Sequence, residues 1–426
     1  MDRFFGIIGL VVILGLAFLM SNNRKAINVR LVLSGLALQL GLALFILKTS
    51  LGQAIFATLG HWITKLLEFS DKGAEFVFGF IVNRELLERV MGPGTGFVFM
   101  FKIMPTIIFV AVLVSIAYHV GLMQRIVAFF AKLMRKLMDV SGAEALSNVA
   151  SAFVGQVEAQ IMIKPYLSTM TRSELLASMT GSMACIAGGV MAVYISMGVP
   201  ANLLLAASIM AAPAALVISK IVMPETEESN TKGTVTLEVK KTHSGIMDAI
   251  SHGAADGLKI SLNVIAMLIG VIALIALIDF LLGKCGMFIY NHTDYATILG
   301  INLQQLSLKE ILGSVFSIFA WTMGVPSSDT HLVGQLLGTK LAINEFVAYS
   351  DLSGMISKGL LSPKALTIVS IACCGFANFS SIAIQVGGIG ELAPSRRAEL
   401  AKLGFKALVC GTLASYLSAT IAGILT

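Results

Sequence analysis

Long runs of apolar residues recur along the whole chain, separated by short polar stretches. They lie at about 4–20, 31–47, 95–121, 174–198, 201–222, 254–283, 365–390 and 403–425. A helix needs about 20 mostly apolar residues to cross a bilayer, whereas a membrane β-strand needs only about 10. The runs therefore predict an all-α integral membrane protein with eight transmembrane helices.

Composition and charge also indicate an integral membrane protein. Of the 426 residues, 56% are hydrophobic and 13% are charged, against about 25% charged in soluble domains. The net charge of +6 comes from basic residues clustered between apolar runs rather than along one polar face, which argues against a nucleic-acid partner. Cysteines and histidines lack metal-ligand spacing, so we expect no cofactor.

The basic clusters also predict an orientation. If the N-terminus is outside, they fall on one side of the membrane; they are Arg24, Lys25 and Arg30, then Arg125, Lys132, Arg135 and Lys136, then Lys220, then Arg396 and Arg397. The first apolar run has no small-residue cleavage site and its basic residues follow it, which indicates a retained span. We expect a multi-pass inner-membrane protein with both termini periplasmic.

Segments 50–92, 124–170 and 307–362 are too short, too polar or too interrupted to cross the membrane. Within them, 124–138 has an apolar and a basic helical face, which is typical of a helix lying in the interface. The longest polar stretch, 224–246, predicts a cytoplasmic loop. We divide the chain into scaffold helices and an interfacial region (1–92), a first repeat (93–222), a cytoplasmic loop (223–248) and a second repeat (249–426).

The two repeats share an order of elements. Glu158 precedes Ser-Met-Ala-Cys ending at Cys185, and Glu345 precedes Ser-Ile-Ala-Cys ending at Cys373, with spacings of 27 and 28 positions. In both halves a long span is followed by an interfacial stretch, a glutamate segment, a broken span and a final span. This order predicts an inverted repeat, as in many secondary transporters.

Glu158 and Glu345 are the candidate functional carboxylates, because a charge at membrane depth is costly unless it is paired or hydrated. The alternative reading places each glutamate in an interfacial loop. Around Glu158, Gly155 and Pro165 favour a broken helix. We therefore expect re-entrant hairpins near 142–170 and 326–362, whose unpaired backbone groups line a polar cavity.

A second polar interruption, Cys374–Ser381, places amides and hydroxyls beside an aromatic ring in an apolar span. Such groups pair with a vicinal diol, while the ring covers the apolar face of a sugar or base. The alternative is polar contact between helices.

The blocks GQVEA with KPY, PETE, NEFVAYS and CGFANFSSIAI resemble those of the concentrative nucleoside transporter family, and the resemblance covers essentially the whole chain. It implies a homotrimer of protomers with eight spans, interfacial helices and two re-entrant hairpins in membrane lipid. It also implies nucleoside import by symport with sodium or protons.

The resemblance assigns substrate-binding roles to individual positions. Nucleobase contacts would come from Gln156, Glu158 and Val190, and ribose contacts from Glu345, Asn378 and Ser381, with Phe376 nearby. A threonine commonly stands where this chain has Val157, so base selectivity is expected to differ from the uridine-type pattern.

The resemblance also places a cation site at Ser151, Val154, Cys185 and Ile186. Relatives that use sodium carry asparagine and serine where this chain has Ser151 and Cys185, and a thiol is a poor ligand for a hard cation. Backbone carbonyls at Ser151, Val154 and Ile186 remain available to sodium. The coupling ion, H⁺ or Na⁺, stays open.

Two other function classes are compatible with a polytopic chain. An intramembrane enzyme acting on a nucleotide-like or lipid-linked substrate could use paired carboxylates as acid and base, although no metal motif or activated nucleophile supports it. A channel or receptor would give flux that never exceeds the gradient, or no flux.

Overall fold

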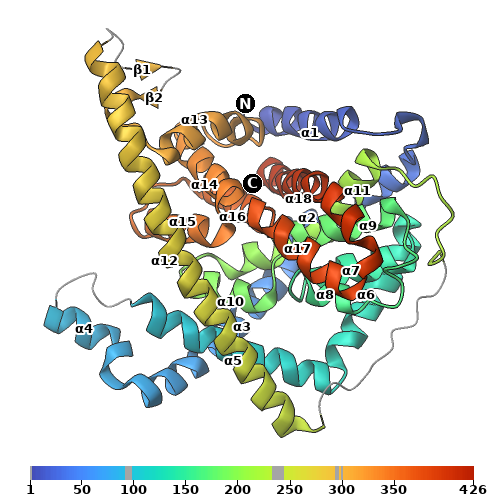
Figure 1. The fold of residues 1–426 in the computed structure, drawn as a ribbon, viewed down its shortest axis with the longest axis horizontal. Coiled ribbons are helices and arrows are strands. Elements are labelled where there is room, and N and C mark those ends of the chain that lie inside the picture. Colours follow the sequence, from blue (N-terminus) through green and yellow to red (C-terminus); the bar gives the residue numbers. More distant parts are fainter. Residues whose placement is uncertain (1, 92–97, 233–243, 293–296, 299–300) are drawn as a thin grey trace.

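A computed structural model describes the chain except for residues 1, 92–97, 233–243, 293–296 and 299–300 (Figure 1). The elements before the first repeat are α1 (Asp2–Leu19), η1 (Arg24–Ala26), α2 (Val29–Lys48), α3 (Ser50–Phe78), η2 (Gly79–Val82) and α4 (Arg84–Met91). The first predicted repeat contains α5 (Phe99–His119), α6 (Leu122–Met138), α7 (Gly142–Ser151), α8 (Glu158–Ile161), α9 (Arg172–Ala184), α10 (Gly188–Ser196) and α11 (Ala201–Val222). The second contains α12 (Ile246–His292), β1 (Thr297–Ile298), β2 (Ile301–Asn302), η3 (Leu303–Gln305), α13 (Leu308–Thr322), α14 (Thr330–Ala342), α15 (Glu345–Ser357), α16 (Pro363–Ala372), α17 (Phe379–Leu392), η4 (Pro394–Arg396) and α18 (Arg397–Leu425).

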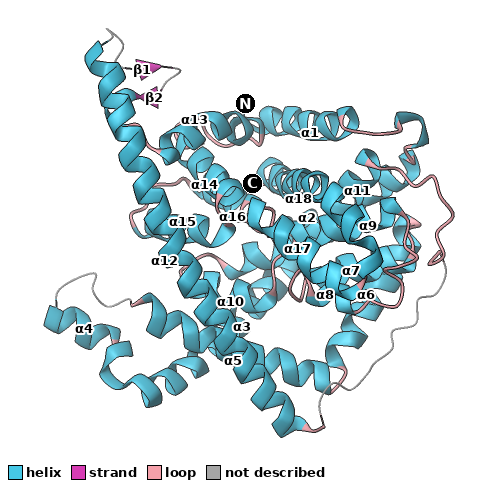
Figure 2. Ribbon diagram, in the orientation of Figure 1, coloured by secondary structure: helices cyan, strands magenta, loops and turns pink. Residues whose placement is uncertain are grey.

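The fold is helical, as predicted, with one small departure. Beyond the end of α12, β1 and β2 form a two-residue antiparallel pair in which Ile298 lies opposite Ile301 (Figure 2). Among the described residues, six helices are long and apolar enough to cross a membrane. The other two predicted spans are the apolar segment Gly6–Leu19 and the broken pair α16 and α17.

The helices follow the order of elements from which two repeats were predicted. In each, a long helix and a second helix precede two short helices, a broken helix and a final helix. Glu158 is the first residue of α8, and Glu345 is the first residue of α15. Helix α7 ends at Ser151, so the helix does break around Gly155, as the glycine predicts.

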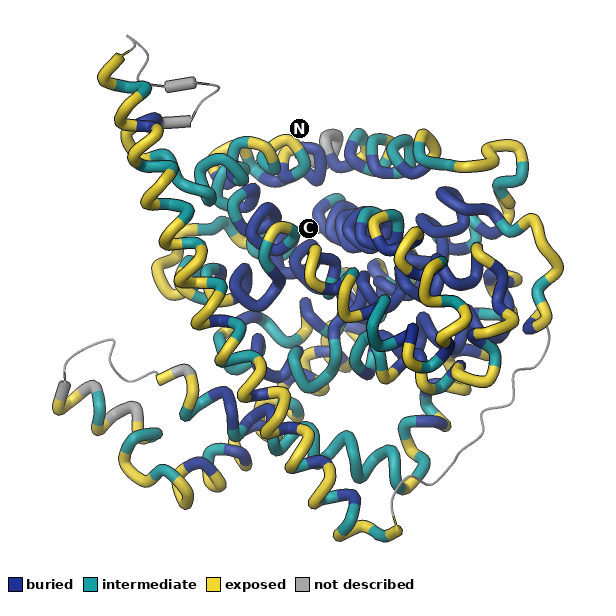
Figure 3. The backbone as a smooth tube through the Cα atoms, viewed as in Figure 1, coloured by how far each residue is buried: buried dark blue, intermediate teal, exposed yellow. Residues whose placement is uncertain are grey.

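The long helix α12 stands along one side of the molecule against α5 (Figure 1). Its 47 residues give a length of about 70 Å. Two glycines allow the close approach, because a Cβ at Gly253 would lie 2.8 Å from Cα of Val112 and one at Gly257 would lie 2.6 Å from Cα of Ile108. Exposed positions predominate along the rest of α12 (Figure 3). They include apolar side chains such as Ile269, which is 68% exposed, whereas Ser261 and Leu268 are buried.

Helices α9, α11 and α18 form the buried centre of the fold (Figure 3). Small residues let their backbones pack closely, as is common between membrane helices. A Cβ at Gly411 of α18 would lie 2.7 Å from Cβ of Met183 in α9. This centre holds the ends of both broken helices in place.

The predicted loop 223–248 is described only in part, since 233–243 lie outside the described residues. Its first part folds back onto the protein: the Gly142 amide donates to the carbonyl of Thr231 at 2.8 Å, and Thr231 is buried. Its last residues already belong to α12, which begins at Ile246.

Candidate functional site

Two helix breaks meet at the centre of the fold. Helix α9 ends at Ala184 and α10 begins at Gly188, while α16 ends at Ala372 and α17 begins at Phe379. The Phe376 amide donates to the Cys185 carbonyl at 3.2 Å. Gly375 has a φ of 132°, and a Cβ there would lie 2.6 Å from the carbonyl oxygen of Ala184. Only glycine fits this crossing without strain.

Glu345 lies beside this crossing, with its side chain buried among hydrogen-bond donors. Asn378 donates from Nδ2 to one carboxylate oxygen at 2.9 Å, and the Tyr194 hydroxyl donates to the other at 3.3 Å. The N-cap of α15 fixes the position of Glu345, which is the first residue of that helix. The Asn344 side chain forms this cap by accepting a hydrogen bond from the Val347 amide at 2.9 Å. The structure therefore brings together Glu345 and Asn378, which lie 33 positions apart.

Asn378 has a second role as the N-cap of α17. Its Oδ1 accepts from the Ser381 amide at 3.0 Å and from the Ser380 hydroxyl at 2.7 Å. This capping fixes the side chain so that Nδ2 points to Glu345. Ser381 is buried one turn into the same helix. The residues predicted to contact ribose, Glu345, Asn378 and Ser381, thus form one cluster.

Aromatic side chains form a wall next to the carboxylate. The rings of Tyr194 and Tyr349 stack with centroids 4.2 Å apart, and Phe346 packs against Tyr194 at 5.7 Å. The Tyr349 hydroxyl donates to the Ser370 carbonyl at 2.7 Å. Sequence reasoning missed Tyr194; a hydroxyl inside an apolar span, four positions after Val190, was the available signal.

The segment between α7 and α8 contacts α17. Gln385 donates from Nε2 to Oε1 of Gln156 at 3.5 Å and to the Met179 carbonyl at 3.2 Å. A Cβ at Gly388 would lie 2.6 Å from a methyl group of Val157. Positions 381, 385 and 388 share one face of a helix. Helix α17 therefore connects the Glu345 cluster to the tip that carries Gln156 and Val157.

The remaining predicted substrate residues, Glu158, Val190 and Phe376, lie on α8, on α10 and in the break between α16 and α17. Glu158 is exposed at the start of α8, beside Gly155, and interacts electrostatically with Tyr118. Val190 lies half-buried on α10, one turn before Tyr194. Phe376 is half-buried and is held through its backbone. Within the described residues, no hydrogen bond joins Glu158 to Glu345.

The predicted cation-site residues also come close together. The Ser151 hydroxyl donates to the Ser147 carbonyl at 2.8 Å and lies 3.0 Å from the hydroxyl of Ser182, one turn before Cys185. The Gly188 amide donates to the Phe153 carbonyl at 3.2 Å, which ties the break at 185–187 to the hairpin tip. Val154, Cys185 and Ile186 are buried.

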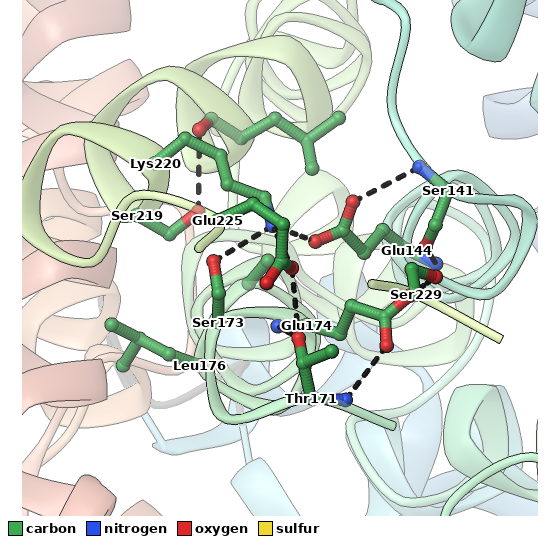
Figure 4. A network of polar contacts seen from close by, with 12 residues as sticks. Ser141, Glu144, Thr171, Ser173, Glu174, Leu176, Ser219, Lys220, Glu225 and Ser229 are labelled. Carbon is green, nitrogen blue, oxygen red and sulfur yellow. Dashed lines mark hydrogen bonds and ion pairs between the residues drawn. The ribbon is translucent and has the colours of Figure 1, made fainter. Parts of the chain in front are cut away.

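A network of charged and hydroxyl groups joins the starts of α7 and α9 to the end of α11 and the segment that follows it (Figure 4). The Lys220 ammonium forms an ion pair with Glu144, lies 3.3 Å from Glu225 and donates to Ser173 at 2.8 Å. Helices α7 and α9 both begin with capping boxes, Ser141 with Glu144 and Thr171 with Glu174. Lys220 is thus a buried, paired charge rather than a free cation at the interface.

Family models match nearly the whole chain. "Na+ dependent nucleoside transporter N-terminus" matches residues 8–81, "Nucleoside recognition" matches 100–201 and "Na+ dependent nucleoside transporter C-terminus" matches 203–423. Together they cover both hairpin segments and both helix breaks.

Individual proteins with similar sequences support the same assignment as the family models. The nucleoside permease NupC of Helicobacter pylori is 36% identical, with 99% of this chain and 97% of that protein covered. Mouse sodium/nucleoside cotransporter 1 is 37% identical over 98% of this chain and 63% of its own length. The solved structure of CNTnw in an inward-facing substrate-bound state is 37% identical, has a TM-score of 0.92, and is matched over 100% of this chain and 98% of that one. The chain therefore belongs to the concentrative nucleoside transporter family.

Proposed function

We propose that this chain imports nucleosides across the inner membrane by symport with a cation. The family consists of transporters, so the chain is a transporter and not an enzyme. The observation that carries the substrate proposal is the buried cluster of Glu345, Asn378 and Ser381. It supplies two acceptor oxygens, an amide and a hydroxyl within one small region.

The cluster has the chemistry that a ribose needs. The carboxylate of Glu345 accepts hydrogen bonds from a vicinal diol, and charge-assisted bonds of this kind are stronger than neutral ones. Tyr194 and Asn378 donate hydrogen bonds to this carboxylate at 3.3 and 2.9 Å. We propose that Glu345, Asn378 and Ser381 bind the ribose hydroxyls.

The base is proposed to bind between the first hairpin tip and α10. Gln156 offers an amide that can both donate and accept, Glu158 offers an acceptor, and Val190 and Phe376 offer apolar surface. Val157 stands against Gly388 of α17. Because valine lacks a hydroxyl, we propose that position 157 selects bases by shape rather than by a hydrogen bond.

We propose that the coupling ion is a proton, with sodium as the alternative. The Ser151 hydroxyl is already engaged with Ser147 and Ser182, and Cys185 would offer a soft thiol to a hard cation. Matching relatives are described as sodium-dependent. Backbone carbonyls of Ser151, Val154 and Ile186 are the groups through which sodium would bind.

The proposed transport cycle divides the protein into a moving part and a fixed scaffold. We propose that the hairpins around α7–α8 and α14–α15 are re-entrant and move with the broken helices, while 1–92, α5 and α12 form the scaffold. The exposed apolar face of α12 suits contact with lipid and with other protomers of a homotrimer. Cation binding would order the first hairpin, and nucleoside would then bridge both repeats before alternating access.

Uptake into proteoliposomes tests the proposal. The purified chain is reconstituted, and accumulation of tritiated uridine, cytidine, adenosine and inosine is measured with an imposed proton gradient or sodium gradient. We expect accumulation of at least one nucleoside above its external concentration with the proton gradient. Accumulation driven by sodium alone would correct the coupling ion, and no uphill uptake of any nucleoside would contradict the function.

A further inference from the structure

A cavity of about 300 Å³ lies where α6 leads into α7, and basic side chains form most of its wall. The proposed transport cycle does not use it. Four of the lining residues are basic and one is acidic, which leaves an excess of three positive charges at neutral pH. The lining residues are Lys132, Arg135, Lys136, Asp139, Val140 and Lys232.

Backbone hydrogen bonds bring the wall of this cavity together from two distant segments. Asp139 caps α6 in the left-handed conformation, with a φ of 53°, and its amide donates to the Arg135 carbonyl at 2.9 Å. The Gly142 amide donates to the carbonyl of Thr231 at 2.8 Å. This second bond holds the segment after α11 against the end of α6, so that Lys232 faces the same cavity as the lysines of the helix.

Two ordinary roles of surface lysines account for only part of this cluster. The negative end of a helix dipole favours basic residues in the last turn, which explains Arg135 and Lys136. It does not explain Lys132, one turn earlier, or Lys232, from another segment. Within the described part of the chain, no carboxylate forms an ion pair with the ammonium groups of Lys132, Lys136 or Lys232.

Helix α6 has three distinct faces. One is buried against α2, α5 and α7. A second is apolar but exposed, and it carries Phe129, Leu133 and Leu137, which recur every four positions and therefore share a face. The third is basic and carries Lys132 and Lys136, also four positions apart. An exposed apolar face beside a basic one is typical of a helix that lies in a membrane interface.

An anionic phospholipid matches both exposed faces of α6 and the cavity beside them. Its phosphodiester accepts charge-assisted hydrogen bonds from ammonium and guanidinium groups. Its acyl chains cover apolar side chains such as Phe129, which is 66% exposed. A neutral lipid would satisfy only the apolar face, and a free phosphate ion would satisfy only the basic one. Basic pockets at the membrane surface are known to take anionic lipid headgroups.

We propose that α6 and Lys232 form a binding site for an anionic phospholipid. The phosphodiester lies in the cavity between Lys132, Lys136 and Lys232, and the acyl chains lie along Phe129 and Leu133. The site shares no residue with the proposed nucleoside site, so nucleoside uptake does not enter its test.

Thermal unfolding of the purified chain in detergent tests the proposal, because a ligand that binds only the folded state raises the Tm. We expect dioleoyl phosphatidylglycerol to raise the Tm by about 2–4 °C. Phosphatidylcholine with the same acyl chains should not raise it. The combined variant Lys132→Gln/Lys136→Gln/Lys232→Gln should lose the shift, and all three lysines are exposed, so the fold should tolerate it.

A matched control removes the same charge from exposed lysines that do not line the cavity. It should keep the full shift with phosphatidylglycerol, because only general attraction to anionic lipid is reduced. The control combines Lys25→Gln, Lys48→Gln and Lys402→Gln.

Water-soluble anions separate a lipid site from a site for free phosphate. We expect little shift from inorganic phosphate or glycerol 3-phosphate, because neither covers the apolar face of α6. Phe129→Ser with Leu133→Ser should reduce the shift caused by phosphatidylglycerol while leaving the basic cavity in place. Native mass spectrometry of the chain released from nanodiscs with equal amounts of the two lipids gives a second readout. Phosphatidylglycerol should remain on the unmodified chain and on the control, and should be lost from the variant of the cavity lysines.

Four outcomes would overturn the lipid site. They are equal shifts with both lipids, equal loss in the cavity variant and the control, a full shift with phosphate alone, and no shift together with no retained phosphatidylglycerol. If the combined variant does not fold, Lys132→Gln/Lys232→Gln carries the same prediction.

Discussion

The amide of Phe376 donates a hydrogen bond of 3.2 Å to the carbonyl of Cys185. These two residues lie in the breaks of the two broken helices, so this bond joins the two halves of the chain. Unpaired backbone groups are costly in a membrane protein, and here each break satisfies part of the other. The Glu345 cluster begins next to this crossing.

Gly375→Ala should destabilise the crossing. Alanine at a φ of 132° is strained, and its Cβ would approach the Ala184 carbonyl to 2.6 Å. The backbone strain alone is worth roughly 1–3 kcal/mol. We expect a lower Tm and reduced nucleoside binding, measured on purified protein. Gly354→Ala, on α15 with open space around it, is the control and should not lower the Tm.

Glu345→Gln should abolish most concentrative uptake. The variant keeps the shape of the side chain but removes the charge that strengthens hydrogen bonds to a diol, a loss of about 1.5–3 kcal/mol per bond. We expect uptake to fall by at least about tenfold. Glu228→Gln, in the exposed part of the 223–248 loop, should transport normally. Unchanged uptake by Glu345→Gln would rule out the ribose role.

Tyr194→Phe should weaken substrate binding modestly. The variant removes the 3.3 Å hydrogen bond to Glu345 and keeps the ring stacked on Tyr349. Because the bond is long, we expect KM to rise by about three- to tenfold with the maximal rate little changed. Tyr290→Phe on α12 serves as the control. A change in thermal stability without a change in KM would indicate a purely structural tyrosine.

Gly388→Ala should impair transport by steric conflict with Val157. The added Cβ would lie 2.6 Å from a valine methyl group and would displace the hairpin tip. We expect initial uptake rates to fall by roughly tenfold, and Val157→Ala in the same chain to restore part of the loss because it removes the conflicting methyl groups. The neighbouring Gly387→Ala, with no atom within 4 Å of its Cβ, should behave like wild type.

Asp329, just before α14 and outside the candidate spans, forms a contact that we expect to be sensitive to acid. Burial alone would raise the pKa of this carboxyl, but hydrogen bonds from Ser362 and Ser328 outweigh it and lower the pKa below its usual value. The Ser362 amide and hydroxyl donate at 3.0 and 2.5 Å.

A lowered folded-state pKa stabilises the fold above the unfolded pKa of about 3.9, and the contribution is lost as pH falls through the folded value. Asp329→Asn should therefore lower the Tm at pH 7, and the difference from wild type should narrow below about pH 4. Thermal unfolding at a series of pH values measures this. A difference that is constant with pH would mean that ionisation of Asp329 contributes no stability.

Several structural features followed from local sequence. Gly155 predicted the end of α7, and the polar interruption at Cys374–Ser381 predicted the gap between α16 and α17. Both depend on backbone preferences that a short segment determines. The structure of the segment 50–92 was harder to predict. Its mixture of charged and apolar residues indicated interfacial structure, but it did not indicate the single 29-residue helix α3.

Contacts between distant segments could not be predicted in this way. Tyr194 and Glu345 lie 151 positions apart, and Gln156 and Gln385 lie 229 apart. Lys220 is one of the basic residues from which the orientation was predicted, and only the structure shows that it is buried against Glu144. The sequence contains the charges, but only packing decides which of them meet.

The sequence by itself determined that the chain lies in a membrane and is helical, because long apolar runs must be shielded from water. It also determined the family, because the family blocks are continuous in the chain. The tertiary structure decided that Glu345 meets Asn378 and Tyr194. The reason is physical. The hydropathy of a segment depends only on its own residues. The distance between two segments depends on how the two broken helices cross, and residue spacing along the chain does not specify that crossing.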